Sequence, residues 1–378
     1  MRAAETMSLV TAVGTRTCRR STPSSRSGGG YSRVSAVGFE GEGARMLETA
    51  FTRLVGCTVP IQVAPMGAIS TPDLIAAASR AGALGMVGTA GMRAEQVTRM
   101  LDTVLGVARG PVGANMLMPF ADKAVVEITA PRVRVFDFYH GAPDPSLVAI
   151  VHRAGALASW QVGSIEEARA AVDAGCDLLA VRGVEGGGRM YGNQPLWPLL
   201  NAVLEAVTVP VLAAGGLATA RDLAAVLAAG ADGARMGTRF VATDESGAHP
   251  LYKQAIVAAT AADTDLVTDF SVFWPNGPEP HRVLRTAVET AHSLAGDVVG
   301  EGMAFGERRP IPRFAAAPPT VDSTGTIEAF ALYAGVSAGT IDRVEPAADV
   351  IDRLVTGAER LLRHRGAADS LDTPGDQP

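Results

Sequence analysis

Residues 209–240 read VPVLAAGGLATARDLAAVLAAGADGARMGTRF, and this stretch contains two short apolar segments that each end in a glycine turn. The first segment ends at Gly215 and Gly216. A phrase with helical spacing separates it from the second, which ends at Gly237 and Thr238. Short, fully apolar segments are typical of parallel strands that are buried on both faces. Because the carboxyl ends of neighbouring parallel strands meet at one edge, both turns are expected to face one space.

The paired glycine turns predict a phosphate-binding site. Glycine has no Cβ, so backbone N–H groups can approach phosphate oxygens closely, and a helix N-terminus adds a favourable partial charge. In eight-stranded α/β barrels a phosphate site after the seventh and eighth strands is frequent. Two ordinary turns in a glycine-rich chain are the alternative interpretation, but their place at adjacent strands favours phosphate.

The same alternation of apolar strands and helical phrases extends back to the start of the apolar sequence. Eight strands are expected at residues 61–64, 84–87, 112–115, 133–137, 156–161, 178–181, 211–214 and 234–236. Seven helices are expected between them at residues 72–81, 94–107, 121–129, 145–153, 165–174, 196–206 and 219–229. This repeat predicts an α/β fold, the (β/α)8 TIM barrel. The alternative is a doubly wound open sheet, but no strand is followed by GxGxxG.

The rhythm changes after the eighth strand, where helical phrases give way to turns rich in proline and glycine. We interpret the change as a small α-rich substrate lobe that is inserted after strand 8 and lies over the barrel mouth. The last helix, at residues 347–363, is expected to return to the barrel. The predicted parts are a barrel at residues 46–241, the lobe at 242–317 and a returning C-terminal part at 318–365.

Both ends of the chain differ from the rest in composition. Residues 1–45 are rich in Arg, Ser and Gly without an apolar period, and residues 366–378 are polar, so both are expected to be disordered. A transit peptide is an alternative interpretation of the first segment. Met46 opens a clean helical phrase and is a second candidate for the true start of the protein.

Composition argues against several functional classes. The formal net charge is −6 and no basic stripe carries interleaved aromatic residues, which argues against nucleic acid as a partner. Cys18, Cys57 and Cys176 form no CxxC pair, which suits a reducing cytoplasm and argues against a metal centre or a disulfide framework. No run of 18 apolar residues predicts a membrane span. We expect a cytoplasmic monomer or homodimer.

The predicted strand ends carry small residues and amides. Ala64, Pro65, Met66 and Gly67 follow the first strand, Asn115 ends the third, Gln161 ends the fifth, and the sixth runs into RGVEGGGRMYG at residues 182–192. These ends show no paired carboxylates, Cys–His pair or metal-ligand cluster. Such a ring is poorly suited to hydrolysis but suits a flat cofactor that brings its own chemistry.

Six phrases in this order carry a resemblance: APMG, GANMLMP, WQVGSIEEA, EGGGR, AAGGLAT and GARMGTRF. Together they resemble the nitronate monooxygenases (2-nitropropane dioxygenases), which are FMN-dependent barrels. The related flavin enoyl-acyl-carrier-protein reductases share most of these phrases. The resemblance extends over residues 58–363, where YAGVSAG and PAADVIDRLV also fit.

The resemblance implies a non-covalent FMN site. It places the backbone of Ala64, Pro65, Met66 and Gly67 beneath the isoalloxazine ring, and Asn115 and Gln161 at the polar edge of the flavin. It places Gly187 and Gly188 near the phosphate or ribitol. It assigns the phosphate to the two turns formed by Ala214, Gly215 and Gly216 and by Gly237 and Thr238. For Asn115 and Gln161 the alternative is an amide that satisfies local backbone at a strand end.

The chain departs from the family at the turn after strand 6. The family turn reads EAGGH, with the histidine as base or substrate contact, whereas this chain has Arg189 in that place. Arginine stays protonated and cannot remove a substrate proton. Arg182 also replaces an uncharged residue. We expect the two guanidinium groups to attract an anion; the alternative is that both are surface arginines over the phosphate.

The catalytic candidates are therefore Arg189, as an anion-binding group, and His140, which lies just past strand 4 and is the best substitute base. His281 in the lobe is the second choice. A nitronate is already deprotonated, so its oxidation needs no enzymatic base. We expect FMN-dependent oxidation of an alkyl nitronate, such as propionate 3-nitronate, by molecular oxygen. Two alternatives remain: an enoyl thioester reductase that uses NAD(P)H, and a flavin-storing barrel without chemistry.

Overall fold

The computed structural model describes residues 47–369. The expectation for residues 1–45, the alternative start at Met46 and most of the expected C-terminal tail lie outside the described residues. Helix α12 (Ala347–Asp369) continues past the predicted tail boundary at residue 366. The sequence predicted a helix that ends at residue 363 and a polar tail from residue 366, but the glycine at 366 costs a helix only about 1 kcal/mol and alanines follow it.

Eight parallel strands form the predicted barrel. Their order is β1-β9-β8-β6-β5-β4-β3-β2, and a bridge between Gln62 and Leu84 joins the first strand to the segment that leads into the last. The strands are β1 (Ile61–Val63), β2 (Gly85–Gly88), β3 (Val112–Leu117), β4 (Val135–Tyr139), β5 (Leu157–Val162), β6 (Leu178–Arg182), β8 (Val211–Ala214) and β9 (Gly233–Met236). Every strand lies within two residues of its predicted ends, so the TIM-barrel prediction is confirmed.

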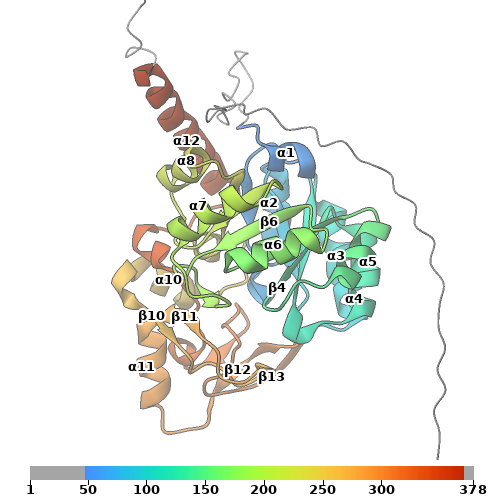
Figure 1. The fold of residues 1–378 in the computed structure, drawn as a ribbon. Coiled ribbons are helices and arrows are strands. Elements are labelled where there is room, and N and C mark those ends of the chain that lie inside the picture. The colour runs from blue at the N-terminus through green and yellow to red at the C-terminus, as the bar shows by residue number, and fades with distance from the viewer. Residues whose placement is uncertain (1–46, 370–378) are drawn as a thin grey trace, which may run out of the picture. The chain divides into compact units, whose positions relative to one another are not determined.

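Helices between the strands cover the outside of the barrel (Figure 1). They are α2 (Pro72–Arg80), α3 (Ala94–Val107), α4 (Lys123–Thr129), α5 (Pro145–Arg153), α6 (Ile165–Asp173), α7 (Leu196–Ala206) and α8 (Ala220–Ala228). Polar N-caps explain where several of them begin. Thr219, for example, accepts a hydrogen bond from the backbone N–H of Asp222, whose carboxylate in turn accepts from the Thr219 N–H. This capping box starts α8 after the Gly215-Gly216 turn.

The amino-terminal end of the barrel is filled by apolar side chains and covered by α1 (Ala50–Val55). Phe51 and Val55 of this helix pack with residues from several strands, Leu84, Met86, Val135, Leu178, Ala180 and Leu212. This packing makes the amino-terminal half of the barrel interior an apolar core. The polar groups of the interior therefore lie at the opposite end, where the strands finish.

The lobe departs from the sequence expectation in its composition. It contains α10 (Pro250–Ala258) and α11 (Arg285–Ser293), but also two strands of each of two three-stranded sheets, which the term α-rich did not predict. One sheet has the order β10-β11-β7 and the other β13-β12-β14. These strands are β7 (Gly188–Arg189), β10 (Thr264–Val267), β11 (His281–Leu284), β12 (Val298–Ala304), β13 (Glu307–Pro312) and β14 (Thr324–Gly325). A missed signal is Phe305-Gly306, which turns β12 into β13 with positive φ at both residues.

Helix α12 occupies the place of the eighth barrel helix. It packs along α8 and α2, the helices that follow the seventh and first barrel strands (Figure 1). Val350, Ile351 and Leu354 of α12 are buried in the barrel core. The lobe is thus inserted between the eighth strand and its own helix.

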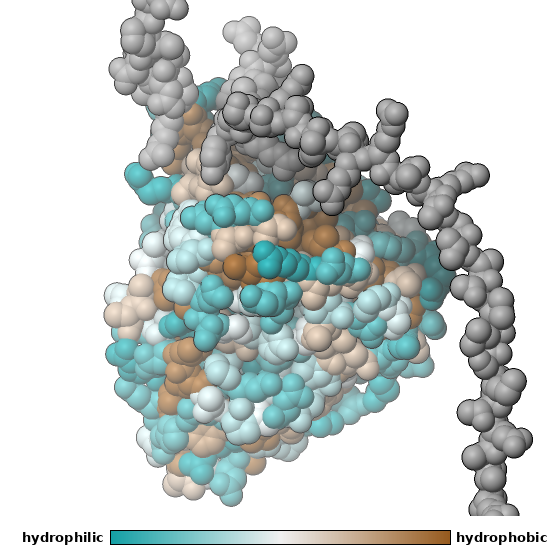
Figure 2. Space-filling view, in the orientation of Figure 1, coloured by the Kyte–Doolittle hydropathy of each residue, from teal (hydrophilic) through white to brown (hydrophobic). Residues whose placement is uncertain are grey.

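The described surface is mixed in polarity. Figure 2 shows hydrophilic residues across most of the visible face with apolar patches between them. The exposed large apolar side chains come from several elements, such as Leu105 from α3, Trp197 from α7 and Leu266 from β10. Within residues 47–369, no helix combines the length and the apolar character that crossing a bilayer requires.

Candidate functional site

A cavity of about 600 Å³ lies between the carboxyl ends of the barrel strands and the lobe, within the usual size range of ligand sites. Every residue that the sequence analysis assigned to FMN lines it. These are Ala64, Pro65, Met66, Gly67, Asn115, Gln161, Gly187, Gly188, Ala214, Gly215, Gly216, Gly237 and Thr238. Of the two catalytic candidates, Arg189 lines the cavity, whereas His140 is not among the lining residues.

The Gly215-Gly216 turn requires glycine at both positions. Their φ angles are 111° and 72°, in the region that side chains rarely adopt. A Cβ on Gly216 would also lie 3.0 Å from Cβ of Glu185 and 3.1 Å from Cγ2 of Val336. The turn therefore brings bare backbone to the cavity directly before α8, which is the arrangement expected of an anion cradle.

The second turn reaches the same cavity from β9. Gly237 precedes the short helix α9 (Thr238–Val241), whose first N–H groups have no carbonyl partner within the helix. The Thr238 hydroxyl accepts a hydrogen bond of 3.0 Å from the Gly335 N–H, which ties the turn to the YAGVSAG segment. Ser337 of that segment also lines the cavity and was missed by the sequence analysis.

In the turn after β6, the Glu185 carboxylate is held away from the cavity, whereas the glycines lie against it. Both oxygens of the Glu185 carboxylate lie about 3 Å from the N–H of Leu196 and accept from it, at the start of α7. A Cβ on Gly187 would lie 2.6 Å from the Gly335 nitrogen, so only glycine fits there. The EGGGR turn thus presents backbone, not a negative charge, to the cavity.

Asn115 and Gln161 belong to a buried polar layer that spans the barrel. The Arg235 guanidinium forms an ion pair with Asp137 at 2.7 Å and donates to Gln161 Oε1 at 2.8 Å. Asn115 Nδ2 donates to Asp137 Oδ2 at 2.8 Å. The sequence analysis missed Asp137 and Arg235, although a charged residue of each sign within an otherwise apolar strand is a usable signal.

Arg189 is buried, with 8% of its surface exposed. It lies on β7, which pairs with β11 of the lobe. Its Nη1 donates to the Glu279 carbonyl at 3.1 Å, its Nη2 donates to the Phe270 carbonyl, and its guanidinium carbon lies 4.5 Å from the centre of the Trp274 ring. Its Nε has no hydrogen-bond partner among the described residues. Desolvation lowers the pKa of Arg189, but an arginine remains charged.

Arg182 is buried to the same degree, with 9% of its surface exposed. Its Nη1 donates to the Tyr139 hydroxyl at 2.6 Å and to the Arg189 carbonyl, and its Nη2 donates to the Gly187 carbonyl. The alternative interpretation of two surface arginines is therefore wrong. Within residues 47–369 neither guanidinium forms an ion pair with a carboxylate.

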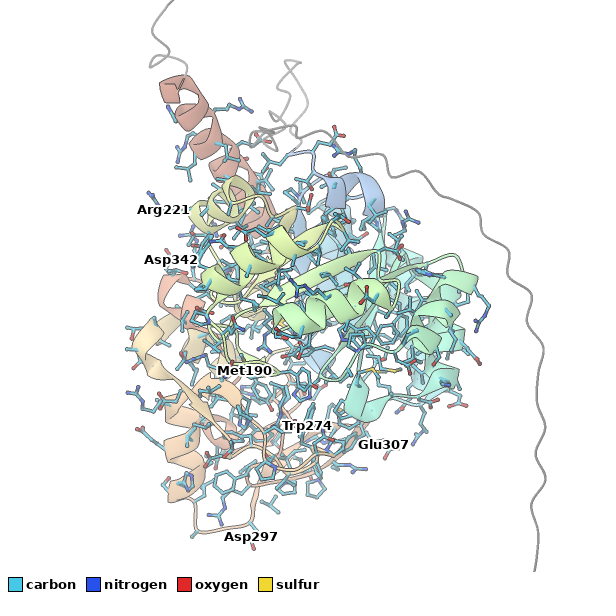
Figure 3. The ribbon with its side chains drawn as sticks, in the orientation of Figure 1. Met190, Arg221, Trp274, Asp297, Glu307 and Asp342 are labelled. Atoms are coloured by element: carbon cyan, nitrogen blue, oxygen red, sulfur yellow. The ribbon has the colours of Figure 1, made fainter. Side chains whose placement is uncertain are left out.

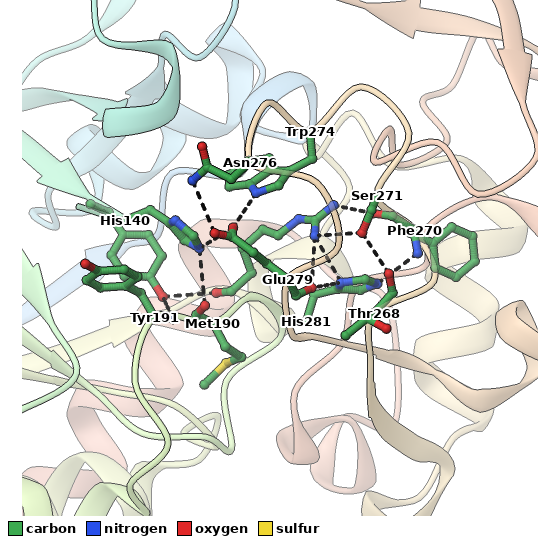
Figure 4. Close-up of polar contacts among 12 residues, drawn as sticks. His140, Met190, Tyr191, Thr268, Phe270, Ser271, Trp274, Asn276, Glu279 and His281 are labelled. Carbon is green, nitrogen blue, oxygen red and sulfur yellow. Dashed lines mark hydrogen bonds and ion pairs between the residues drawn. The ribbon is translucent and has the colours of Figure 1, made fainter.

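His140 does not line the cavity and lies in a network of polar contacts with Met190 and Glu279 (Figure 4). Its Nε2 is 3.2 Å from the Met190 carbonyl and 3.4 Å from Glu279 Oε2, and its ring meets that of Trp274 edge-on at 5.0 Å. Desolvation lowers the pKa of His140, and the Glu279 carboxylate opposes that shift. Met190 and Trp274 lie where the barrel meets the lobe (Figure 3). His140 as a base has no direct access to the cavity in this arrangement.

His281 is fully buried and held as a neutral ring. Its Nε2 accepts a hydrogen bond of 3.2 Å from the Phe270 N–H, and its Nδ1 lies 2.9 Å from the Glu279 carbonyl, to which it donates. Desolvation is the largest cause that lowers its pKa to about 4. These contacts fix the segment on which Arg189 rests.

Aromatic side chains of the lobe, together with Phe120 from the loop after β3, form a roof that was not predicted from the sequence. The rings of Phe120 and Trp274 are 5.5 Å apart, those of Phe120 and Phe305 6.1 Å, and those of Phe273 and Phe305 5.5 Å. All four line the cavity, as does Tyr333. Burial raises the pKa of the Tyr333 hydroxyl, while the Arg189 guanidinium opposes that shift.

The roof is anchored on the far side of the barrel mouth by the β12–β13 turn. Gln96 Nε2 of α3 donates to the carbonyls of Phe305 and Gly306 at 3.4 and 3.3 Å. Arg93 and Glu307 form an ion pair of 3.0 Å beside them. The cavity therefore has two unlike walls, a polar floor at the strand ends and an apolar roof.

Comparison with known proteins agrees with this geometry. The family model described as nitronate monooxygenase matches residues 48–128 and 119–357. The chain belongs to the nitronate monooxygenase family. Nitronate monooxygenase of Pseudomonas aeruginosa is 28% identical over 58% of this chain and 77% of that protein.

Two further similarities extend beyond the family name. A (3aS,4S,5R,7aS)-5-hydroxy-7a-methyl-1-oxo-octahydro-1H-indene-4-carboxyl-CoA dehydrogenase of Rhodococcus jostii is 33% identical over 67% of this chain and 70% of that protein. The structure of FabK from Thermotoga maritima is 29% identical with a TM-score of 0.70, covering 85% of this chain and all of FabK. The nitronate monooxygenase family is thus an oxidoreductase family whose relatives act on more than one kind of substrate.

Proposed function

We propose that this protein is an FMN-dependent oxidoreductase that oxidises an alkyl nitronate, such as propionate 3-nitronate, with molecular oxygen. The residues fit FMN at both of its ends. Gly216 and Gly237 bring bare backbone from two strand ends to one side of the cavity. Asn115 and Gln161 offer amide groups on another part of the wall. The chemistry that bound FMN supplies is electron acceptance from the substrate and transfer to oxygen.

The observation that carries the substrate class is the pair of buried arginines. Arg182 and Arg189 line the cavity, and their N–H groups are matched by carbonyl and hydroxyl oxygens rather than by carboxylates. Both guanidinium groups thus lack a carboxylate in contact, although the Glu279 carboxylate acts on Arg189 from further away. A buried charge without a paired partner is costly. An anionic ligand in the cavity would supply a paired negative charge.

The chain's own residues would bind and orient a nitronate rather than deprotonate it. His140 and His281 are absent from the lining, and Arg189 cannot act as a base. A nitronate has already lost its proton, so this site needs only to hold the anion and exclude water. A neutral nitroalkane would need a base and is expected to react poorly.

A matched pair of substitutions tests this role. The oxidised protein is mixed without oxygen with propionate 3-nitronate, and loss of the flavin band is followed. Arg189→Met removes the charge at similar length, and Arg189→Lys keeps it. We expect the methionine variant to need about tenfold to hundredfold more nitronate for the same rate, from the loss of a charged hydrogen bond of about 1.5–3 kcal/mol.

The lysine variant is the control for lost packing, since both variants lose the contacts to Phe270 and Glu279. It is expected to stay within about tenfold of the native protein, because the charge is retained. If the rate depends on the nitronate concentration in the same way in the native protein and both variants, Arg189 does not bind the anion.

A redox reaction on an acyl thioester is the second candidate, and the aromatic roof favours it. Phe120, Phe273, Trp274 and Phe305 offer an apolar surface larger than a short nitronate requires. The Rhodococcus relative is described as acting on a bicyclic CoA ester. Rapid bleaching by NADPH, reversed by an enoyl thioester, would favour this candidate. A protein that none of these reagents reduces would be a flavin-storing barrel.

A further inference from the structure

The Arg235–Asp137 ion pair lies at the centre of the barrel mouth. Arg235 is on β9 and Asp137 is on β4, four strands away in the sheet order, so the guanidinium reaches across the interior. The contact is two-pronged, with Nη2 donating to Oδ1 at 2.7 Å and Nη1 donating to Oδ2 at 3.1 Å. The two side chains are 2% and 0% exposed.

The pair contacts two amides of the cavity wall, and Arg235 itself also lines the cavity whereas Asp137 does not. Asn115 lies beside Asp137 in the β3–β4 register, and its Nδ2 donates to the carboxylate at 2.8 Å. An ionised carboxylate only accepts hydrogen bonds, so the NH2 end of Asn115 must face it. Its Oδ1 therefore points to the other side. In the described structure no hydrogen-bond donor reaches this oxygen.

The reverse holds for Gln161. Its Oε1 accepts from Arg235 Nη1 at 2.8 Å. A guanidinium only donates hydrogen bonds, so the oxygen end must face Arg235 and the NH2 end must turn away. Gln62 Oε1 and the Ser159 hydroxyl, with bonds of 2.8 and 2.7 Å, hold the outer sides of the pair. The network thus allows one orientation for each amide.

We infer that the Arg235–Asp137 pair is a positioning device that sets the hydrogen-bonding polarity of the cavity: Asn115 presents an acceptor and Gln161 presents a donor. This inference rests on the proposed function as an FMN enzyme. The polar edge of an isoalloxazine ring has one N–H between two carbonyl groups. An acceptor beside a donor matches that edge, whereas two amides free to turn would present the wrong group part of the time.

The test measures binding of FMN to the flavin-free protein by quenching of flavin fluorescence. Arg235→Lys keeps the charge but loses the planar fork that holds Asp137, Gln161 and Gln62 together. We expect FMN to bind about tenfold more weakly or worse, because one misdirected amide leaves a buried polar group unpaired. The native protein should also strongly prefer FMN over FMN methylated at N3, and the variant should lose most of this preference.

The matched control is Arg239→Lys. Arg239 is 2% exposed, forms an ion pair of 3.6 Å with Glu345, donates to the carbonyls of Ala242 and Arg343, and does not line the cavity. Both substitutions remove a buried fork and should lower the melting temperature. Only Arg235→Lys should change FMN affinity and the preference over the N3-methyl analogue.

If Arg235→Lys does not fold, Gln161→Glu gives an independent test. Glutamate still accepts from Arg235 but offers no donor to the cavity, so FMN affinity should fall by about tenfold. If the native protein binds FMN and the variant binds it equally tightly, this inference alone is overturned. A native protein that does not bind FMN overturns the proposed function and this inference with it.

Discussion

Buried charge at single residues shapes the behaviour of the site. Arg189 donates to the Phe270 and Glu279 carbonyls of the lobe. His281, as a neutral ring, contacts the Phe270 N–H and the Glu279 carbonyl and so holds the same two residues in place (Figure 4). A protonated His281 could not accept the hydrogen bond from the Phe270 N–H. The wall that carries the cation therefore depends on a histidine that must stay uncharged.

This dependence predicts a loss of stability in acid. The pKa of His281 is lowered to about 4 in the folded protein, against about 6.5 in the unfolded chain. Between these values the unfolded state binds a proton that the folded state does not, so stability falls as the pH drops. The full effect is about 3 kcal/mol, present above pH 7 and lost by pH 4.

Urea unfolding of the native protein and of His281→Gln at several pH values measures the effect. The variant is expected to be less stable at pH 7, and the difference between the two proteins should shrink towards pH 4. A constant difference across this range would show that His281 is not the titrating group.

Whether a residue of the site could be predicted from the sequence depends on how far away its partners lie in the chain. The glycine turns follow predicted strands directly and the amides Asn115 and Gln161 end them, so a local pattern and a family resemblance were enough to place them on the cavity wall. The contact between Asp137 and Arg235 joins residues 98 positions apart across the barrel. No local pattern contains the strand register that brings them together.

At the scale of elements, α8 lies between two glycines, Gly216 and Gly230. Both have positive φ, but their surroundings differ. Gly216 precedes the helix and faces the cavity, with φ 72°. Gly230 follows the helix with φ 100°, and the nearest atom to a Cβ placed there is 3.9 Å away. The helix thus carries its own control for any test of the phosphate cradle.

We expect Gly216→Asp to abolish FMN binding and Gly230→Asp to preserve it. Each substitution costs about 1–2 kcal/mol from the left-handed backbone, but only the first puts a side chain and a negative charge into the cradle. Flavin content after purification and the melting temperature of both flavin-free proteins measure the two effects. Full flavin content in Gly216→Asp would show that the phosphate binds elsewhere.

The elements of the lobe show where sequence reasoning stopped. The barrel strands are short apolar runs with glycine turns, and each was predicted. The lobe strands β10 and β11 are four residues long and carry charged residues such as Asp265 and Arg282. They pair with each other, and β11 also pairs with the β7 segment of the barrel loop, which is distant in sequence and has no strand pattern of its own.

At the scale of the whole molecule, the barrel is completed by α12. Val350, Ile351, Leu354 and Val355 of this helix are at most 4% exposed. Burying four such side chains contributes about 6–12 kcal/mol, which is comparable to the total stability of a typical domain. All eight strands precede this helix, yet they are not expected to form a stable barrel without it.

A chain that ends at residue 346 is therefore expected not to fold, whereas a chain that ends at residue 369 should keep the native melting temperature. Circular dichroism and thermal unfolding of the two proteins decide this point. A cooperative transition in the shorter chain would show that the helix is an accessory to the barrel.

The insertion of the lobe also sets the order in which the protein can be assembled. Strand β9 ends at Met236 and α12 begins at Ala347, so about 110 residues must leave the ribosome between the last strand and the helix that covers it. During that interval the surfaces of α2 and α8 that α12 later covers have no partner, and closure of so long a loop is slow. The nascent chain is most prone to aggregation during this interval, which ends only when α12 has been synthesised and covers these helices.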